Sequence, residues 1–130
     1  MDHDYDKLRI HVHTEMMGDD LCVNIYGGDR AHIGSVAIAE PRPSLTGDGS
    51  ISATVSTYNC LGHKDGEVAE AVAQALTSGL NHRTVVVCGI HYNKVTAGLL
   101  EEIGKITELI IRDILLSSAE ISKKPFAICG

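Results

Sequence analysis

Residues 84–93 read TVVVCGIHYN, and this stretch decides the fold. Thr84 to Cys88 is a β-branched and apolar run with no polar alternation, which is typical of a strand buried on both faces. We therefore expect an interior strand. Gly89 and His91 follow it at the carboxyl end, where ligands often collect in sheets that carry helices.

Amphipathic helices are predicted on both sides of this strand. Before it, Val68 to Leu76 has apolar residues at the i, i+3, i+4 spacing of a helix. After it, a longer helical pattern runs from Val95 to Leu115, and its apolar surface is wider than one stripe. A second apolar face needs a cover, so we expect a homodimer through the last helix.

Four segments before the first helix alternate apolar and polar residues and predict antiparallel strands: 8–13, 21–26, 35–39 and 51–57. Pro41 and Pro43 are expected to end the third of them. The order is then ββββ-α-β-α, an α+β fold with a mostly antiparallel sheet and two helices packed on one face. We expect a single domain over 1–130, in which 1–6 and 119–130 are peripheral.

The composition narrows the function classes. The 130 residues carry a formal net charge of -6, which argues against binding to a phosphate backbone. The chain has no Trp and one Phe, so the core is expected to be aliphatic. With no export-signal pattern and no apolar run of about 18 residues, we expect a cytoplasmic protein with reduced thiols and no membrane span.

Three short segments place histidine beside glycine, and we call them the three glycine–histidine segments: 27–34, 62–66 and 88–93. In the first, Gly27 and Gly28 can expose N–H groups to an anion, and Arg30 can add a bidentate contact. A plain hairpin turn explains the same glycines equally well. His32 lies in the same segment.

The second and third segments are more specific. Gly62-His63-Lys64-Asp65 opens a helix, whose free N–H groups favour an anion; the alternative is that Asp65 only caps the helix. Gly89 and His91 follow the interior strand, and His91 is the best single candidate for a functional residue. A structural histidine bonded to backbone is the alternative there.

Metal binding is a further hypothesis. His32, His63 and His91 could form a three-histidine zinc site with an open position, which would suit a small metal-dependent hydrolase. Their separations match no metal motif, however. His11 and His13 share one side of the first strand, and exposed polar positions explain them better than a metal does.

At its three glycine–histidine segments the chain resembles the LpdD-like family, small accessory proteins encoded beside prenylated-flavin decarboxylases such as gallate decarboxylase. The matching residues are Gly27-Gly28 with His32 to Ala37, then Gly62 to Asp65, then Gly89-Ile90-His91. The likeness extends from about the second strand to the last helix. Family members are described as chaperone-like, and their fold looks similar to that of proteasome assembly chaperone four, a dimerising module.

The resemblance implies a non-catalytic role: binding prenylated FMN or FMN, and helping it to reach or mature in a UbiD-type decarboxylase. By motif position, the ligand site would be lined by His32, His63, Lys64, Asp65 and His91, with the Gly27-Gly28 turn beside it. The shortage of aromatic residues is a difficulty for a flavin ring. A protein–protein assembly factor similar to proteasome assembly chaperones is the alternative, in which the glycines only form turns.

Overall fold

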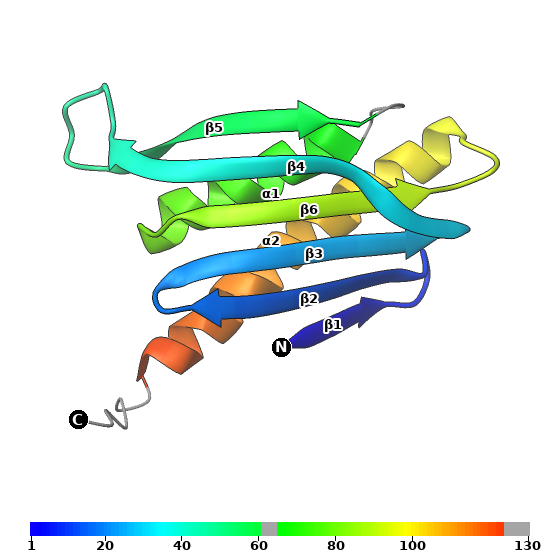
Figure 1. Cartoon of the computed structure of the whole chain (residues 1–130), viewed down its shortest axis with the longest axis horizontal. Coiled ribbons are helices and arrows are strands. Elements are labelled where there is room, and N and C mark those ends of the chain that lie inside the picture. Colours follow the sequence, from blue (N-terminus) through cyan, green and yellow to red (C-terminus); the bar gives the residue numbers. More distant parts are fainter. Residues whose placement is uncertain (61–64, 124–130) are drawn as a thin grey trace.

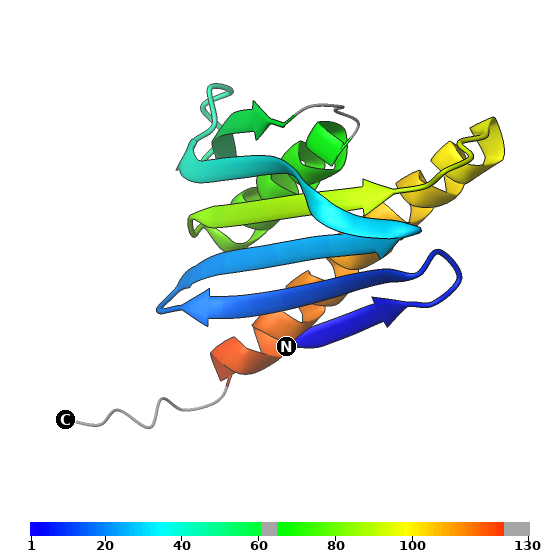
Figure 2. The same ribbon diagram turned by 45° about the vertical axis from the view of Figure 1, so that its right-hand side comes forward.

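The protein is an α+β domain in which two helices cover one face of a six-stranded sheet (Figures 1 and 2). The computed structural model describes residues 1–60 and 65–123, and the side chains of the last helix up to Ser118. Its elements are β1 Asp2–Tyr5, β2 Ile10–Met17, β3 Asp20–Gly28, β4 Arg30–Pro43, β5 Ile51–Asn59, α1 Asp65–Leu80, β6 Thr84–His91 and α2 Ala97–Lys123. The predicted fold class is confirmed, with one strand more than expected.

The sheet has the order β1-β2-β3-β6-β4-β5, so β6 is an interior strand, as its sequence predicts. It pairs in parallel with β3 and antiparallel with β4, and Val86 and Cys88 are fully buried on the helix side. The four earlier strands therefore do not form one antiparallel run. β6 separates β3 from β4, but the helices cover only one of its faces: Val85 and Val87 are half-buried, so the expected burial on both faces is wrong.

β1 was not predicted, because residues 2–5 are almost entirely polar. It pairs antiparallel with β2 at the edge of the sheet, and the Tyr5 hydroxyl donates to Asp113 of α2 at 2.7 Å. β1 is an edge strand, and two of its polar side chains, Asp2 and Asp4, have partners on β2.

β4 is much longer than the predicted 35–39, and it continues through Pro41 and Pro43. Ser44 N–H donates to Ser50, and Gly34 accepts from Cys60, so the even-numbered residues of β4 make the hydrogen bonds to this neighbour. The two prolines are odd-numbered and face the other edge. On that edge the pairing with β6 stops at Ala39 and Thr84, so β4 has no partner strand beside the two prolines. The N–H groups that the prolines lack therefore remove no hydrogen bond from the sheet.

α2 packs a stripe of buried residues on the sheet: Ile106, Ile110, Ile114 and Ser118. Part of its second apolar face is covered by α1, where Leu115 lies against Gly79. Leu100 and Leu116 remain 44% and 60% exposed. No helix among the described residues is long and apolar enough to cross a membrane.

A bulge in β4 lies opposite Gly89. Ala31 pairs with Ile90 and Ser35 pairs with Cys88, so the three residues His32 to Gly34 face Gly89 alone. A Cβ at Gly89 would overlap the carbonyl oxygen of His32. The absence of a side chain at Gly89 therefore allows the backbone of the β4 bulge to lie directly against β6.

Gly89→Ala is expected to lower the free energy of unfolding by about 2 kcal/mol or more, because backbone must move to admit the methyl group. Gly104→Ala is the matched control, since no atom lies within 4 Å of a Cβ there. Gly104 lies in α2, where alanine is favoured, so this variant should be neutral or more stable by about 0.5–1 kcal/mol. Urea unfolding of both variants measures the difference, and equal stabilities would contradict the close contact.

Candidate functional site

The first and third glycine–histidine segments meet at the end of β6. Gly28 of β3 pairs with His91 on one side, and Arg30 of β4 pairs with the same residue on the other. The turn between them crosses the strand end, where Asp29 N–H donates to the His91 carbonyl at 2.6 Å. Two segments some sixty residues apart in sequence thus form one surface.

Gly27 and Gly28 make this crossing possible. Both have positive φ, and a Cβ would overlap the carbonyl oxygen of Arg9 at Gly27 and that of His91 at Gly28. The N–H groups of Gly28 and Asp29 donate to these two carbonyl oxygens. The Gly28 N–H, one of the two groups of the predicted anion nest, is therefore not available to a ligand. Both glycines provide close backbone contact.

Asp65 joins the second segment to the other two. The Asp65 side chain is 11% exposed: its Oδ1 accepts Ile90 N–H at 3.0 Å, and its Oδ2 lies 3.3 Å from His32 Nε2. The Cys88 thiol lies 4.0 Å from Oδ1. A Cβ at Gly34 would overlap this carboxylate. Asp65 therefore does more than begin α1, because it links the helix to both β6 and the bulge.

His91 completes the cluster on the described part of the chain. Its ring is edge-on to the ring of His32, with centroids 6.4 Å apart, and its Nε2 lies 3.2 Å from Asn93 Oδ1. The structure thus brings His32, Asp65 and His91 together. Gly62, His63 and Lys64 lie outside the described residues.

A hollow of about 500 Å³ lies beside this cluster, and we call it the open-face hollow. It is lined by His13, Asn24, Ile25, Tyr26, Ala31, His32, Ile33 and Val87. The pairs His13–Asn24 and Asn24–Val87 place these side chains side by side on three neighbouring strands. The hollow thus combines histidine and amide groups with an apolar floor. Sequence reasoning missed Asn24 and Ile33, because only the sheet pairing and the bulge bring them there.

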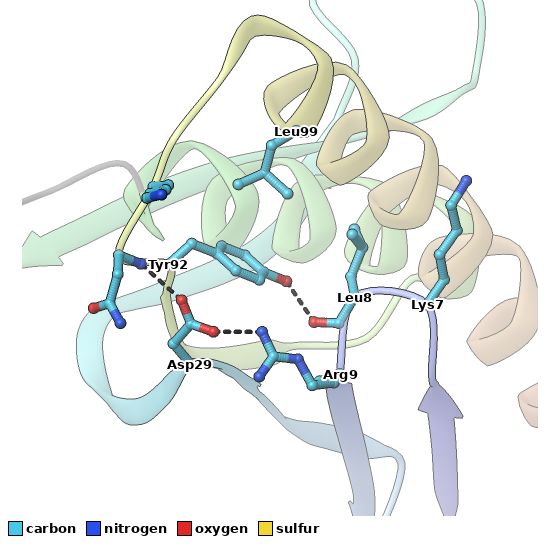
Figure 3. Close-up of a pocket in the computed structure, with 8 residues that line it drawn as sticks. Lys7, Leu8, Arg9, Asp29, Tyr92 and Leu99 are labelled. Atoms are coloured by element: carbon cyan, nitrogen blue, oxygen red, sulfur yellow. Dashed lines mark hydrogen bonds and ion pairs between the residues drawn. The ribbon is translucent and has the colours of Figure 1, made fainter.

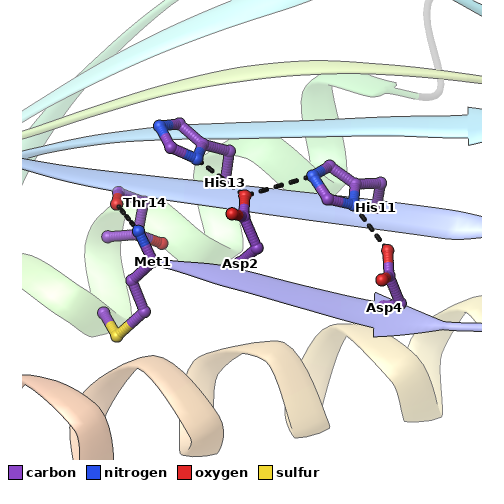
Figure 4. Close-up of polar contacts among 6 residues, drawn as sticks. All are labelled: Met1, Asp2, Asp4, His11, His13 and Thr14. Atoms are coloured by element: carbon purple, nitrogen blue, oxygen red, sulfur yellow. Dashed lines mark hydrogen bonds and ion pairs between the residues drawn. The ribbon is translucent and has the colours of Figure 1, made fainter.

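His11 and His13 are held by carboxylates of β1 (Figure 4). His11 Nδ1 bonds Asp4, and Asp2 Oδ1 lies 3.3 Å from His11 Nε2 and 2.7 Å from His13 Nδ1. The His11 ring also lies 5.1 Å from the ring of Tyr26, which lines the open-face hollow. These histidines therefore fasten β1 to the sheet next to the hollow.

Metal binding has no support within residues 1–60 and 65–118. No group of three or more His, Cys, Asp or Glu side chains in this part of the chain could hold a metal ion. The three-histidine zinc hypothesis also requires His63, which lies outside it. Zinc binding by His32, His63 and His91 therefore stays a prediction.

The fold and the site define a small α+β domain with a ligand-sized hollow at the carboxyl end of its central strand. A family model described as the prenylated flavin chaperone LpdD-like domain matches residues 4–119. The chain belongs to this family, as its three glycine–histidine segments predict. The match supports a chaperone or accessory role.

Comparison with solved structures supports the fold independently. One similar chain comes from a crystal structure of a novel chaperone complex for yeast 20S proteasome assembly. The two share 11% sequence identity and a TM-score of 0.59, over 91% of this chain and 94% of the other. At this identity the likeness is one of fold alone. A comparison with curated proteins found no significant match.

The Cys88 thiol is expected to resist alkylation in the folded protein. Burial and the nearby Asp65 charge raise the pKa of this thiol, so very little reactive thiolate forms. Cys22 and Cys60 are only half-buried and serve as internal controls. Iodoacetamide labelling followed by peptide mass spectrometry should modify these two first, and Cys88 only after unfolding. Labelling of Cys88 at the rate of Cys60 would contradict its position.

Protonation of His11 should strengthen the attachment of β1. The hydrogen bond to Asp4 is the main cause that raises the pKa of His11 above 6.5. The resulting stability is fully present below pH 6.5 and is lost as pH rises through the folded-state pKa. An NMR titration of the ring should show a raised pKa in wild type and a value nearer 6.5 in Asp4→Asn. An equal pKa of His11 in wild type and Asp4→Asn would contradict the Asp4–His11 interaction.

Proposed function

We propose that the chain is a non-catalytic accessory protein that binds prenylated FMN, or FMN itself, and helps it to reach or mature in a UbiD-type decarboxylase. The observation that carries the proposal is the family match over residues 4–119, to a domain described as a prenylated flavin chaperone. The cofactor and the partner enzyme are both part of the proposal. The contacts around the open-face hollow support the cofactor.

The open-face hollow suits one face of a flavin ring. Its volume of about 500 Å³ lies within the range of small-molecule sites. Tyr26 and Ile33 are 39% and 65% exposed, and with Val87 they offer apolar contact in a chain that has few aromatic residues. Asn24, His13 and His32 supply hydrogen-bonding groups for the polar edge of the ring. One aromatic side chain, Tyr26, and the aliphatic side chains beside it would thus contact the flavin ring.

Arg30 is proposed to bind the flavin phosphate. It is exposed and adjoins Ala31 of the hollow, and its side chain makes no hydrogen bond or ion pair with any described residue. A guanidinium matches a phosphate well, because two parallel N–H groups can bond two oxygens. His63 and Lys64 adjoin Asp65 in sequence, and with Gly62 we propose that they complete the phosphate end.

Self-association through α2 is a further part of the proposal. Leu100 and Leu116 leave apolar surface on this helix that no described residue covers. Because much of the second apolar face already packs within the domain, the remaining surface is smaller than the sequence suggests. A homodimer would cover it.

Isothermal titration with FMN and riboflavin tests the cofactor. Tyr26→Ala should weaken binding of both flavins by about tenfold, because a ring contact contributes roughly 1–3 kcal/mol. Arg30→Gln should weaken FMN alone, since riboflavin has no phosphate. Tyr58→Ala is the matched control: this tyrosine is 72% exposed on β5 but does not line the hollow.

The result that would contradict the proposal is equal FMN binding by Tyr26→Ala and Tyr58→Ala, or no binding of either flavin or of prenylated FMN by wild type. The delivery step has its own measurement. Apo-decarboxylase should gain activity faster from the chain loaded with prenylated FMN than from the same concentration of free cofactor. Equal rates would leave a binding protein without a delivery role.

A further inference from the structure

A second pocket lies at the same end of the sheet, and nothing in the proposed function uses it (Figure 3). We call it the Arg9 pocket. It encloses about 450 Å³ and is lined by Lys7, Leu8, Arg9, Asp29, Tyr92, Asn93, Lys94 and Leu99. None of these residues lines the open-face hollow. The two cavities are therefore separate, although Asp29 and Tyr92 directly adjoin Arg30 and His91 in sequence.

The backbone around this pocket is built with some strain. Arg9 has φ of 55°, a conformation that costs a non-glycine residue about 1 kcal/mol. The chain is held there because Gly28 N–H donates to the Arg9 carbonyl and the guanidinium bonds Asp29. Asp29 uses its other oxygen to accept Asn93 N–H at 2.8 Å. Strain maintained in this way is often found where a side chain is positioned for a ligand.

The charge of the pocket is unusual for this chain. Three cationic side chains from two distant loops, Lys7, Arg9 and Lys94, line it in a protein of net charge -6. Two carboxylates oppose them: Asp29 binds Arg9, and Glu102 lies 3.2 Å from Lys7. Lys94 has no hydrogen bond or ion pair with any described residue. The three cations outnumber the two carboxylates by one, so the charge of the pocket favours a ligand with one negative charge.

Apart from Asn93, the uncharged residues of the lining offer mainly apolar surface: Leu8, Tyr92 and Leu99. Leu8 is 8% exposed, and the Tyr92 hydroxyl donates to the Leu8 carbonyl at 2.6 Å, which fixes the ring across the pocket. Leu99 of α2 lines the side of the pocket that is formed by this helix, as Figure 3 shows. Inorganic phosphate would leave this apolar surface unused. A ligand that carries a charge on an apolar body would use both parts.

We propose that the Arg9 pocket is a binding site for a small organic acid. Its carboxylate lies at the cationic rim formed by Lys7, Arg9 and Lys94. Its apolar body lies against Leu8, Tyr92 and Leu99. The carboxylate exchanges water for two or three charge-assisted hydrogen bonds, and the burial of the body supplies the remaining affinity. The site is independent of flavin, since it shares no lining residue with the open-face hollow.

Benzoate titrated into the flavin-free protein, followed by NMR, tests this site. The methyl signals of Leu8 and Leu99 should shift with saturation. Lys94→Gln should raise the dissociation constant by about fivefold or more, the effect of losing roughly 1 kcal/mol, and Lys94→Arg should restore it. Arg83→Gln is the control variant. It removes a cation that precedes β6 at the opposite end of the sheet, so benzoate binding should not change.

Two ligand controls separate the contributions of charge and apolar contact. Benzyl alcohol has nearly the same body without the charge, and inorganic phosphate has charge without the body; both should bind more weakly than benzoate. The proposal is overturned if benzoate leaves the Leu99 methyls unshifted, if Lys94→Gln binds as wild type does, or if either control ligand binds as tightly. These readouts need no flavin, so they succeed or fail independently of the proposed cofactor.

Discussion

The Asp65 carboxylate is almost fully buried at the start of α1, and the arrangement of the site depends on it. A buried charge is costly unless it is hydrogen-bonded or paired, and this one accepts the Ile90 amide and lies beside the imidazole of His32. Those contacts join the helix, the central strand and the β4 bulge at one point. Because the bulge crosses Gly89, the same point sets the shape of the open-face hollow.

Much of the fold could be predicted from local patterns, because β6 and both helices bury continuous apolar surface that the sequence displays directly. What could not be predicted is non-local. The insertion of β6 between β3 and β4 depends on pairing between distant segments. β1 has no apolar pattern, and its place is decided by contacts of Asp2 and Asp4 with histidines of β2. Single-strand periodicity contains neither kind of information.

In the candidate site, too, local sequence patterns could be recognised in advance, whereas contacts between distant segments could not. Glycine beside histidine at strand ends singled out the segments that contain His32, Asp65 and His91, but the sequence left open whether these segments meet, and the structure brings the three residues together. Gly27 and Gly28 admit the backbone of Arg9 and His91 closely, a contact between distant segments that the sequence does not display. Tyr26, Asn24 and Ile33 became part of the site only through register and bulge. The Arg9 pocket has no motif at all, because its cations come from two unrelated loops.

Hydrogen exchange at the Ile90 amide tests most directly whether Asp65 holds these elements together. In wild type this amide should exchange slowly, as expected of a half-buried strand amide that is hydrogen-bonded to a carboxylate. In Asp65→Ala it should exchange at least about tenfold faster, while the Val86 amide in the middle of the same strand stays protected. Equal protection of the Ile90 amide in the two proteins would contradict this role of Asp65, because α1, β6 and the β4 bulge would then stay together without the carboxylate.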